Sequence, residues 1–186
     1  EGGCIVTDDH DLLLKIKDAR LLGIEKDTEK RYTDQRSWEF DVSVQGWRFH
    51  MSNIMGAIGL VQLQRFPEMR AKRQRLARCY DDLLNGHSPI QKFQINYDYV
   101  VPHIYVVRIP EMTDRKLLQN RLLELGIQTG VQYQPNHVLS FYNKQKSLPL
   151  PITETVFPEL LSLPLHPDLN EEDIDFVCKT LKGFFL

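Results

Sequence analysis

Residues 54–84 form one long stretch with helical spacing, and Pro67 divides it into two parts of different character. Before Pro67 the apolar residues cover a wide arc, which predicts a helix buried in a core. The part after it, residues 68–84, is amphipathic and predicts a helix on the surface of a second core. Because proline removes a helical hydrogen bond, we expect a kink or a new start at Pro67 and a boundary between two regions of the chain.

The region before Pro67 predicts too few elements to enclose a core. Residues 3–7 predict a short buried strand, and a helical pattern follows it up to a stop at Gly23. One strand and two helices cannot close a hydrophobic core. We therefore predict that residues 1–66 are the end of a larger layered domain.

The region after residue 88 combines strand and helix patterns. Residues 103–109 predict a strand, and a helix capped by Thr113 and closed by Gly126 follows. Residues 127–133 predict a second strand. The three segments together predict a β-α-β unit of minimal length.

A proline-rich segment leads to a last helix. Asn170 caps this helix, and residues 171–173 place three acidic side chains in its first turn, where the helix dipole favours negative charge. We therefore predict a compact α/β domain over residues 67–186, entered through a connecting helix at about residues 67–84.

Charge and hydropathy argue against two kinds of partner. The net charge is −2 over 186 residues, which gives no attraction to nucleic acid or to an anionic membrane. The arginines of residues 70–78 are typical of a solvated helix face. No apolar run approaches the roughly 18 residues of a membrane-spanning helix, and the first residues show no signal-peptide pattern.

Neither cysteines nor histidines form a metal or disulfide pattern. Cys4, Cys79 and Cys178 lie far apart, and so sparse and odd a count is typical of a reducing cytoplasm. We expect each thiol to be a small buried hydrophobic group. The histidines include no HxxxH or HxH pair, so we predict no metal site.

Two short segments carry candidate binding groups. Arg48 and His50 stand just before a predicted helix N-terminus, a suitable place for a phosphate; an exposed charge and a packed histidine are the simpler interpretation from residue type alone. Tyr133 and His137 stand where a predicted strand enters a loop. Taken alone, they are equally typical of a structural turn.

The order of several segments resembles that of the DegT/StrS-type sugar aminotransferases. The segments are EGGCIVTDDHDLLLKIKDARLLGI, GWRFHMSNIMGAIGLVQLQRF, RAKRQRLARCYDDLL, HIYVVRI, LLELGIQTGVQYQPNH, LPITE and LSLPLHPDLNEEDIDFV. These enzymes have the aspartate-aminotransferase-like fold (fold type I). The resemblance covers nearly the whole chain and implies the α/β C-terminal portion of that fold, with residues 1–66 as the end of the large domain and residues 67–186 as the small domain.

The resemblance implies a reaction that depends on pyridoxal phosphate (PLP). Family members are homodimers that move an amino group, usually from glutamate, to a keto-sugar linked to a nucleotide diphosphate, for amino-sugar and polysaccharide biosynthesis. A lysine holds the cofactor as a Schiff base. In the family this lysine precedes the segment that begins at Glu1, so we expect no catalytic lysine in this chain and no activity from the chain alone.

The resemblance also identifies candidate site residues, although the chain departs from the family pattern at both places. The family usually has Gly-x-Asn-x-Arg-Met at the helix entry, where Asn and Arg reach the cofactor phosphate of the partner subunit. Here Arg48 and His50 take those positions. Gln132 stands where the family commonly has His, and Gln cannot titrate. The resemblance implies that Gln132, Tyr133 and His137 bind substrate, with His137 either a ligand contact or a loop anchor.

Two alternatives remain open from the sequence. One is a non-catalytic C-terminal module for dimerisation or binding, because the apolar faces of residues 3–22 and 54–66 would favour association if left uncovered. The other is a PLP-dependent sugar dehydratase of the same fold, in which a histidine replaces the Schiff-base lysine.

Overall fold

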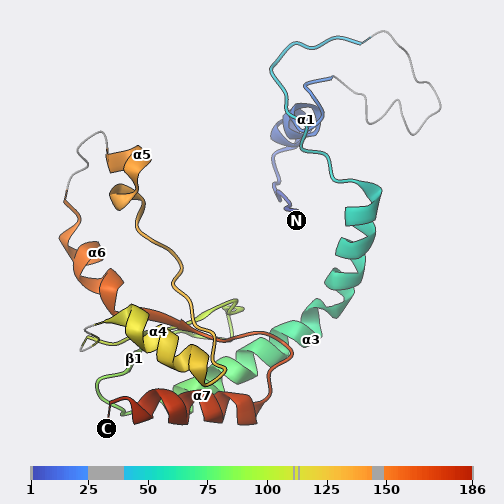
Figure 1. Cartoon of the computed structure of the whole chain (residues 1–186). Helices are drawn as coiled ribbons and strands as arrows, with labels where there is room; N and C mark the ends of the chain where they lie inside the picture. The colour runs from blue at the N-terminus through green and yellow to red at the C-terminus, as the bar shows by residue number, and fades with distance from the viewer. Residues whose placement is uncertain (1, 25–39, 111, 113, 144–148, 186) are drawn as a thin grey trace. The chain divides into compact units, whose positions relative to one another are not determined.

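The computed structural model describes residues 2–24, 40–110, 112, 114–143 and 149–185. The chain divides into two compact units, Glu1–Arg65 and Phe66–Leu186 (Figure 1). Among the described residues, no helix is long and apolar enough to cross a membrane.

The first unit contains helix α1 (His10–Ala19), which confirms the predicted helix. It begins one residue after Asp9, whose side chain accepts a hydrogen bond from the Leu12 N–H at 2.9 Å. The strand predicted at residues 3–7 is wrong: Ile5 and Val6 are exposed, and none of the described residues pairs with this segment. A strand needs a partner for its backbone hydrogen bonds, and an apolar pattern does not supply one.

Helix α3 (Asn53–Leu83) continues through Pro67, so the prediction that a new helix starts there is wrong. Proline removes one backbone donor, and the turns on either side keep theirs. The Ser52 hydroxyl caps the helix by accepting from the Met55 N–H at 3.3 Å. The prediction that residues 54–66 are buried is also wrong: Ile54 is 75% exposed and Leu63 is 68% exposed.

The second unit is built on a small antiparallel sheet. Its strands are β1 (Gln91–Lys92), β2 (Tyr105–Arg108) and β3 (Leu160–Leu163), in the order β1-β2-β3. Strand β2 alternates between buried and half-buried residues, as expected for a strand with one face on a core. The sequence predicted β2 but not β3, which lies within the proline-rich segment.

The predicted β-α-β unit takes a different form. Helix α4 (Arg115–Glu124) follows β2, but residues 127–133 form only an isolated antiparallel bridge between Gly130 and Ser162. Because β2 and Gly130 both pair antiparallel with β3, they run in the same direction with β3 inserted between them. Periodicity predicted the local elements, but it could not reveal a strand inserted from 30 residues further along the chain.

The ends of α4 also refine the prediction. The helix is capped by Asp114, whose side chain accepts from the Leu117 N–H at 2.9 Å; the predicted cap, Thr113, lies outside the described residues. Gly126 follows the helix with a φ of 81°, a left-handed conformation that suits glycine.

The core of the second unit lies between the sheet, the C-terminal half of α3, α4 and α7 (Glu171–Gly183), as Figure 1 shows. Asn170 and Asp173 form a capping box at the start of α7, which confirms the predicted cap. The largest fully buried side chains are Tyr80, Leu76, Leu84, Ile109, Leu122, Leu161, Ile174, Leu181, Val107 and Cys178.

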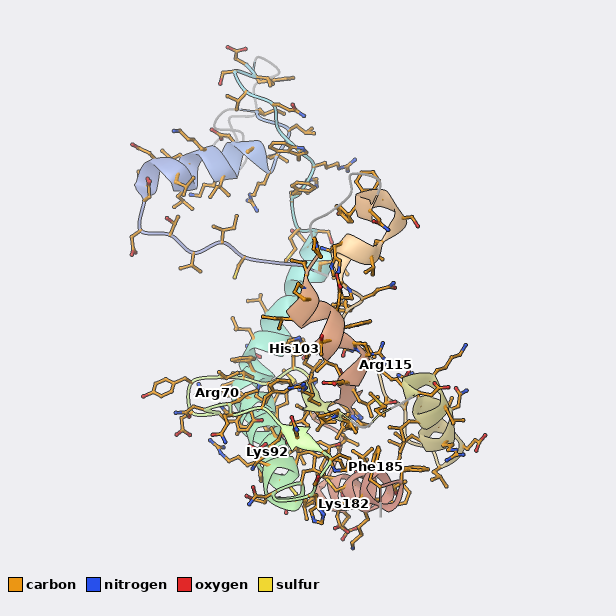
Figure 2. The ribbon with its side chains drawn as sticks, turned by 90° about the vertical axis from the view of Figure 1, so that its left-hand side faces the viewer. Arg70, Lys92, His103, Arg115, Lys182 and Phe185 are labelled. Atoms are coloured by element: carbon orange, nitrogen blue, oxygen red, sulfur yellow. The ribbon has the colours of Figure 1, made fainter. Side chains whose placement is uncertain are left out.

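Two stacked tyrosines join the helices to the sheet. The rings of Tyr80 on α3 and Tyr105 on β2 lie 4.5 Å apart. The Tyr80 hydroxyl donates to the Pro164 carbonyl at 2.9 Å, and the Tyr105 hydroxyl donates to Asp81 at 2.7 Å. Lys92 of β1 donates to the Asp81 carbonyl at 2.9 Å (Figure 2), so the same turn of α3 anchors two strands.

The remaining elements follow Gly130. They are a 3-10 helix (Asn136–Val138), α5 (Ser140–Asn143), α6 (Pro151–Val156) and a second 3-10 helix (Phe157–Glu159) that leads into β3. No described residue from 131 to 156 is buried. The segment therefore leaves the sheet at Gly130 and returns to it at β3 without contributing to the core.

The buried tyrosines predict alkaline unfolding. Burial raises the pKa of Tyr97 to about 12 and that of Tyr80 and Tyr105 further above their ordinary value of 10.0. The folded state therefore holds these protons more tightly than the unfolded chain, so the stabilisation is complete below pH 10 and is lost as the pH rises above it. We expect phenolate absorbance and the loss of helical circular dichroism to rise together above that pH. Phenolate formation at all seven tyrosines with the helical signal intact would contradict this.

Candidate functional site

The segment that carries Arg48 is held by backbone hydrogen bonds to the end of α1. Leu21 and Arg48 form an antiparallel bridge. The Trp47 N–H donates to the Ala19 carbonyl at 2.7 Å, the Leu22 N–H to the Trp47 carbonyl at 2.9 Å, and the Phe49 N–H to the Arg20 carbonyl at 2.8 Å. These bonds fix the backbone just before α3.

Two glycines permit this pairing. Gly23 has a φ of 74°, which disfavours any residue with a Cβ. A Cβ on Gly46 would lie 1.8 Å from the Gly23 nitrogen and 2.6 Å from its Cα. The two backbones therefore approach so closely that only glycine fits at residue 46.

Arg48 is presented to solvent from this fixed backbone. The rings of Trp47 and Phe49 stack with centroids 6.2 Å apart and nearly parallel planes, and side chains alternate along an extended segment. Arg48 thus lies on the opposite side from the two rings, and it is exposed. Among the described residues its guanidinium has no hydrogen-bond or ion-pair partner.

This arrangement suits a phosphate. A guanidinium offers a planar fork of donors that matches phosphate oxygens. His50, also exposed, lies two residues further on, and the N-terminus of α3 follows at Asn53. Unpaired N–H groups at the start of a helix favour an anion. The role of Arg48 and His50 as phosphate ligands stays a prediction, and their exposure before α3 is compatible with it.

The other candidates lie in the second unit. Gln132 is exposed, and Tyr133 is 82% exposed. His137 differs from both: its side chain is only 12% exposed, and its Nε2 lies 3.3 Å from a carboxylate oxygen of Glu154 in α6. The structure thus places Gln132, Tyr133 and His137 on one short segment, with the first two directed to solvent and the third in contact with the protein.

Glu154 was not identified as a functional residue from the sequence. It follows Pro151 in the first turn of α6, where acidic residues commonly stabilise a helix. The position at the start of the helix already explains an acidic residue there. The sequence therefore showed no sign of the contact with His137, which lies 17 positions away.

The arginines within residues 70–78 of α3 have acceptors within the protein. Arg75 pairs with Glu171 at 3.1 Å, and Arg78 pairs with Asp98 at 2.6 Å. Arg73 donates to the Leu165 carbonyl at 2.9 Å and to the His103 carbonyl at 3.2 Å. These contacts agree with the prediction that this part of α3 is a surface helix packed on a core.

The cysteines differ from one another in burial. Cys178 is buried, and burial raises the pKa of its thiol to about 12, so it stays protonated as a hydrophobic group. Cys79 is half-buried, and Cys4 is exposed, which contradicts the prediction that every thiol is buried. Among the described residues, no group of three or more histidine, cysteine and acidic side chains is arranged to hold a metal.

Known proteins similar to this chain point to one family. The model of the DegT/DnrJ/EryC1/StrS aminotransferase family matches residues 1–182. The uncharacterized protein MJ1066 of Methanocaldococcus jannaschii is 29% identical over 192 residues, which cover 98% of this chain and 49% of that protein. The chain thus spans about half the length of this relative.

Solved structures agree. PseC of Helicobacter pylori, an aminotransferase involved in the biosynthesis of pseudoaminic acid, superposes with a TM-score of 0.83 at 25% identity, over 96% of this chain and 47% of PseC. Spr1654 of Streptococcus pneumoniae, solved in its PLP form, gives 0.81 at 27% identity, over 95% of this chain and 44% of Spr1654. The predicted fold class, the C-terminal part of a fold type I sugar aminotransferase, is confirmed.

The glycine pair gives a prediction about the site. We expect Gly46→Ala to disrupt the pairing between residues 19–22 and 47–49, because its Cβ would collide with the Gly23 backbone. Hydrogen exchange of the Trp47 and Phe49 amides should accelerate by about tenfold or more as their hydrogen bonds are lost. Gly59→Ala is the control: nothing lies within 4 Å of its Cβ, so exchange at these amides should not change. Unchanged exchange in Gly46→Ala would show that the close approach is not required.

Proposed function

We propose that this chain, which belongs to the DegT/DnrJ/EryC1/StrS aminotransferase family, is part of a PLP-dependent enzyme. This enzyme moves an amino group from glutamate to a keto-sugar nucleotide. The observation that carries the proposal is the family match over residues 1–182. The PLP form of Spr1654 supports the cofactor, and the role of PseC in making pseudoaminic acid supports a sugar substrate in amino-sugar or polysaccharide biosynthesis.

Residues 1–66 are the end of the large cofactor-binding domain in this proposal, and residues 67–186 are the small domain. The exposed apolar side chains in the first turns of α3 support the assignment. Ile54, Ile58 and Val61 share one face of the helix and are each more than half exposed, and a soluble enzyme covers an apolar face of this kind.

Arg48 and His50 hold the cofactor phosphate of the partner subunit in a homodimer. PLP, when bound, accepts electrons from the substrate and carries the amino group between the two substrates. Arg48 contributes a charge-assisted fork of hydrogen bonds from a backbone that is already fixed, so little backbone entropy is lost when the phosphate binds. The exposure of its guanidinium supports this role.

Gln132, Tyr133 and His137 lie on the substrate side. The Gln132 amide both donates and accepts hydrogen bonds but does not titrate, so it orients the sugar nucleotide and transfers no proton. Tyr133 offers an exposed ring and a hydroxyl. The sparse cysteines support a cytoplasmic location for the enzyme.

We expect none of the lysines in residues 1–186 to hold PLP covalently. In the family the Schiff-base lysine belongs to a segment other than those recognised here, and the lysines of α1 stand on an exposed helix face. We expect no cofactor absorbance after incubation with PLP and no lysine adduct after borohydride reduction, as judged by mass spectrometry. A single lysine adduct accompanied by transaminase turnover would contradict the proposal.

A complementation experiment tests the dimer and Arg48 together. In a full-length enzyme containing this chain, Arg48→Ala and a variant lacking the Schiff-base lysine should each be nearly inactive. Equal mixing after dissociation should restore roughly a quarter of wild-type activity, because half of the dimers are mixed and each has one complete site. Arg121→Ala, at an exposed arginine of α4, is the control and should retain full activity. Failure of the mixture to regain activity would show that Arg48 does not act across the interface.

A further inference from the structure

Two fixed points bracket the segment that carries Gln132 and Tyr133. At one end Gly130 exchanges two backbone hydrogen bonds with Ser162 of β3, at 3.0 and 2.8 Å. At the other end the His137 ring contacts Glu154 at 3.3 Å. The residues between them pack on no core. A short segment with both ends held has few conformations, so its ends determine where Gln132 and Tyr133 stand.

Glu154 is itself well placed to hold the ring. The oxygen that faces His137 also accepts a hydrogen bond from the Leu150 N–H at 3.1 Å, at the start of α6. This bond restrains the carboxylate, so the contact with His137 loses less side-chain entropy than an exposed ion pair. The His137 ring is shielded from water and salt, while the Glu154 side chain is about half exposed, so screening of the contact is reduced only on the side of the ring.

The helix that carries Glu154 is tied to the core through Arg115 of α4. The Arg115 guanidinium donates to the carbonyls of Phe157 and Leu160 and lies over the Phe157 ring, 4.4 Å from its centroid (Figure 2). Phe157 directly follows α6. Contacts therefore run without a break from α4, through α6 and Glu154, to His137.

We propose that Glu154 is a positioning residue: through His137 it fixes residues 131–137 and so sets where Gln132 and Tyr133 meet the sugar nucleotide. His137 is a loop anchor and does not touch the substrate. This inference rests on the proposed function for the identity of the ligand, but the geometry of the anchor does not depend on it.

The test is a double-mutant cycle in a full-length enzyme containing this chain. Glu154→Ala and His137→Ala should each raise the KM for the keto-sugar nucleotide by roughly five- to tenfold with kcat unchanged, because each removes the same contact between the ring nitrogen and the carboxylate. The double variant should be no worse than either single variant. Glu154→Gln, which keeps an acceptor oxygen, should recover most of the loss.

Two further measurements separate positioning from other roles. Hydrogen exchange of the Val138 and Leu139 amides, which donate to the Pro135 and Asn136 carbonyls at 3.2 and 3.1 Å, should accelerate equally in Glu154→Ala and His137→Ala. The melting temperature should stay unchanged, since no described residue of 131–156 is buried. Glu124→Ala, which removes an exposed carboxylate from α4, is the matched control and should change neither KM nor exchange.

Particular outcomes would overturn the inference. A raised KM in His137→Ala alone would mean that the ring touches the substrate, and unchanged exchange in Glu154→Ala would mean that Glu154 fixes nothing. If the wild-type enzyme transfers no amino group to any keto-sugar nucleotide, the proposed function fails. The exchange measurements, which need no substrate, still decide whether Glu154 positions the segment.

Discussion

The second unit depends on strand β3, because both edges of this strand are hydrogen-bonded to other segments. On one edge it pairs with β2 through four residues, and on the other Ser162 exchanges two hydrogen bonds with Gly130. Removing β3 would leave β2 with only a two-residue partner and would release the segment that follows Gly130. The core helices and the candidate substrate segment therefore depend on the same four residues.

The first unit depends on a steric constraint of another kind. The backbones of Gly23 and Gly46 approach too closely for a side chain, and this approach allows residues 47–49 to pair with the end of α1. The pairing places Trp47 and Phe49 on one side and leaves Arg48 exposed on the other. The backbone position of Arg48 is therefore set by Gly23 and Gly46, two residues without a side chain.

Local signals in the sequence predicted local structure well. Asn170 followed by acidic residues predicted the start of α7, and Gly126 predicted the end of α4, because caps involve only neighbouring residues. Burial was predicted poorly for residues 3–7 and 54–66. An apolar pattern shows that a surface requires cover but does not specify which part of the protein provides it.

The sequence by itself determined the start of α7, the end of α4, the family and the candidate residues Arg48, His50, Gln132, Tyr133 and His137, since caps, spacing and ordered motifs are properties of the chain. Only the tertiary structure decided that β3 is inserted between β2 and Gly130, and that His137 contacts Glu154. Both are contacts between residues distant in the chain. Pairings of that kind arise when the backbone closes on itself, and periodicity within a short window carries no information about them.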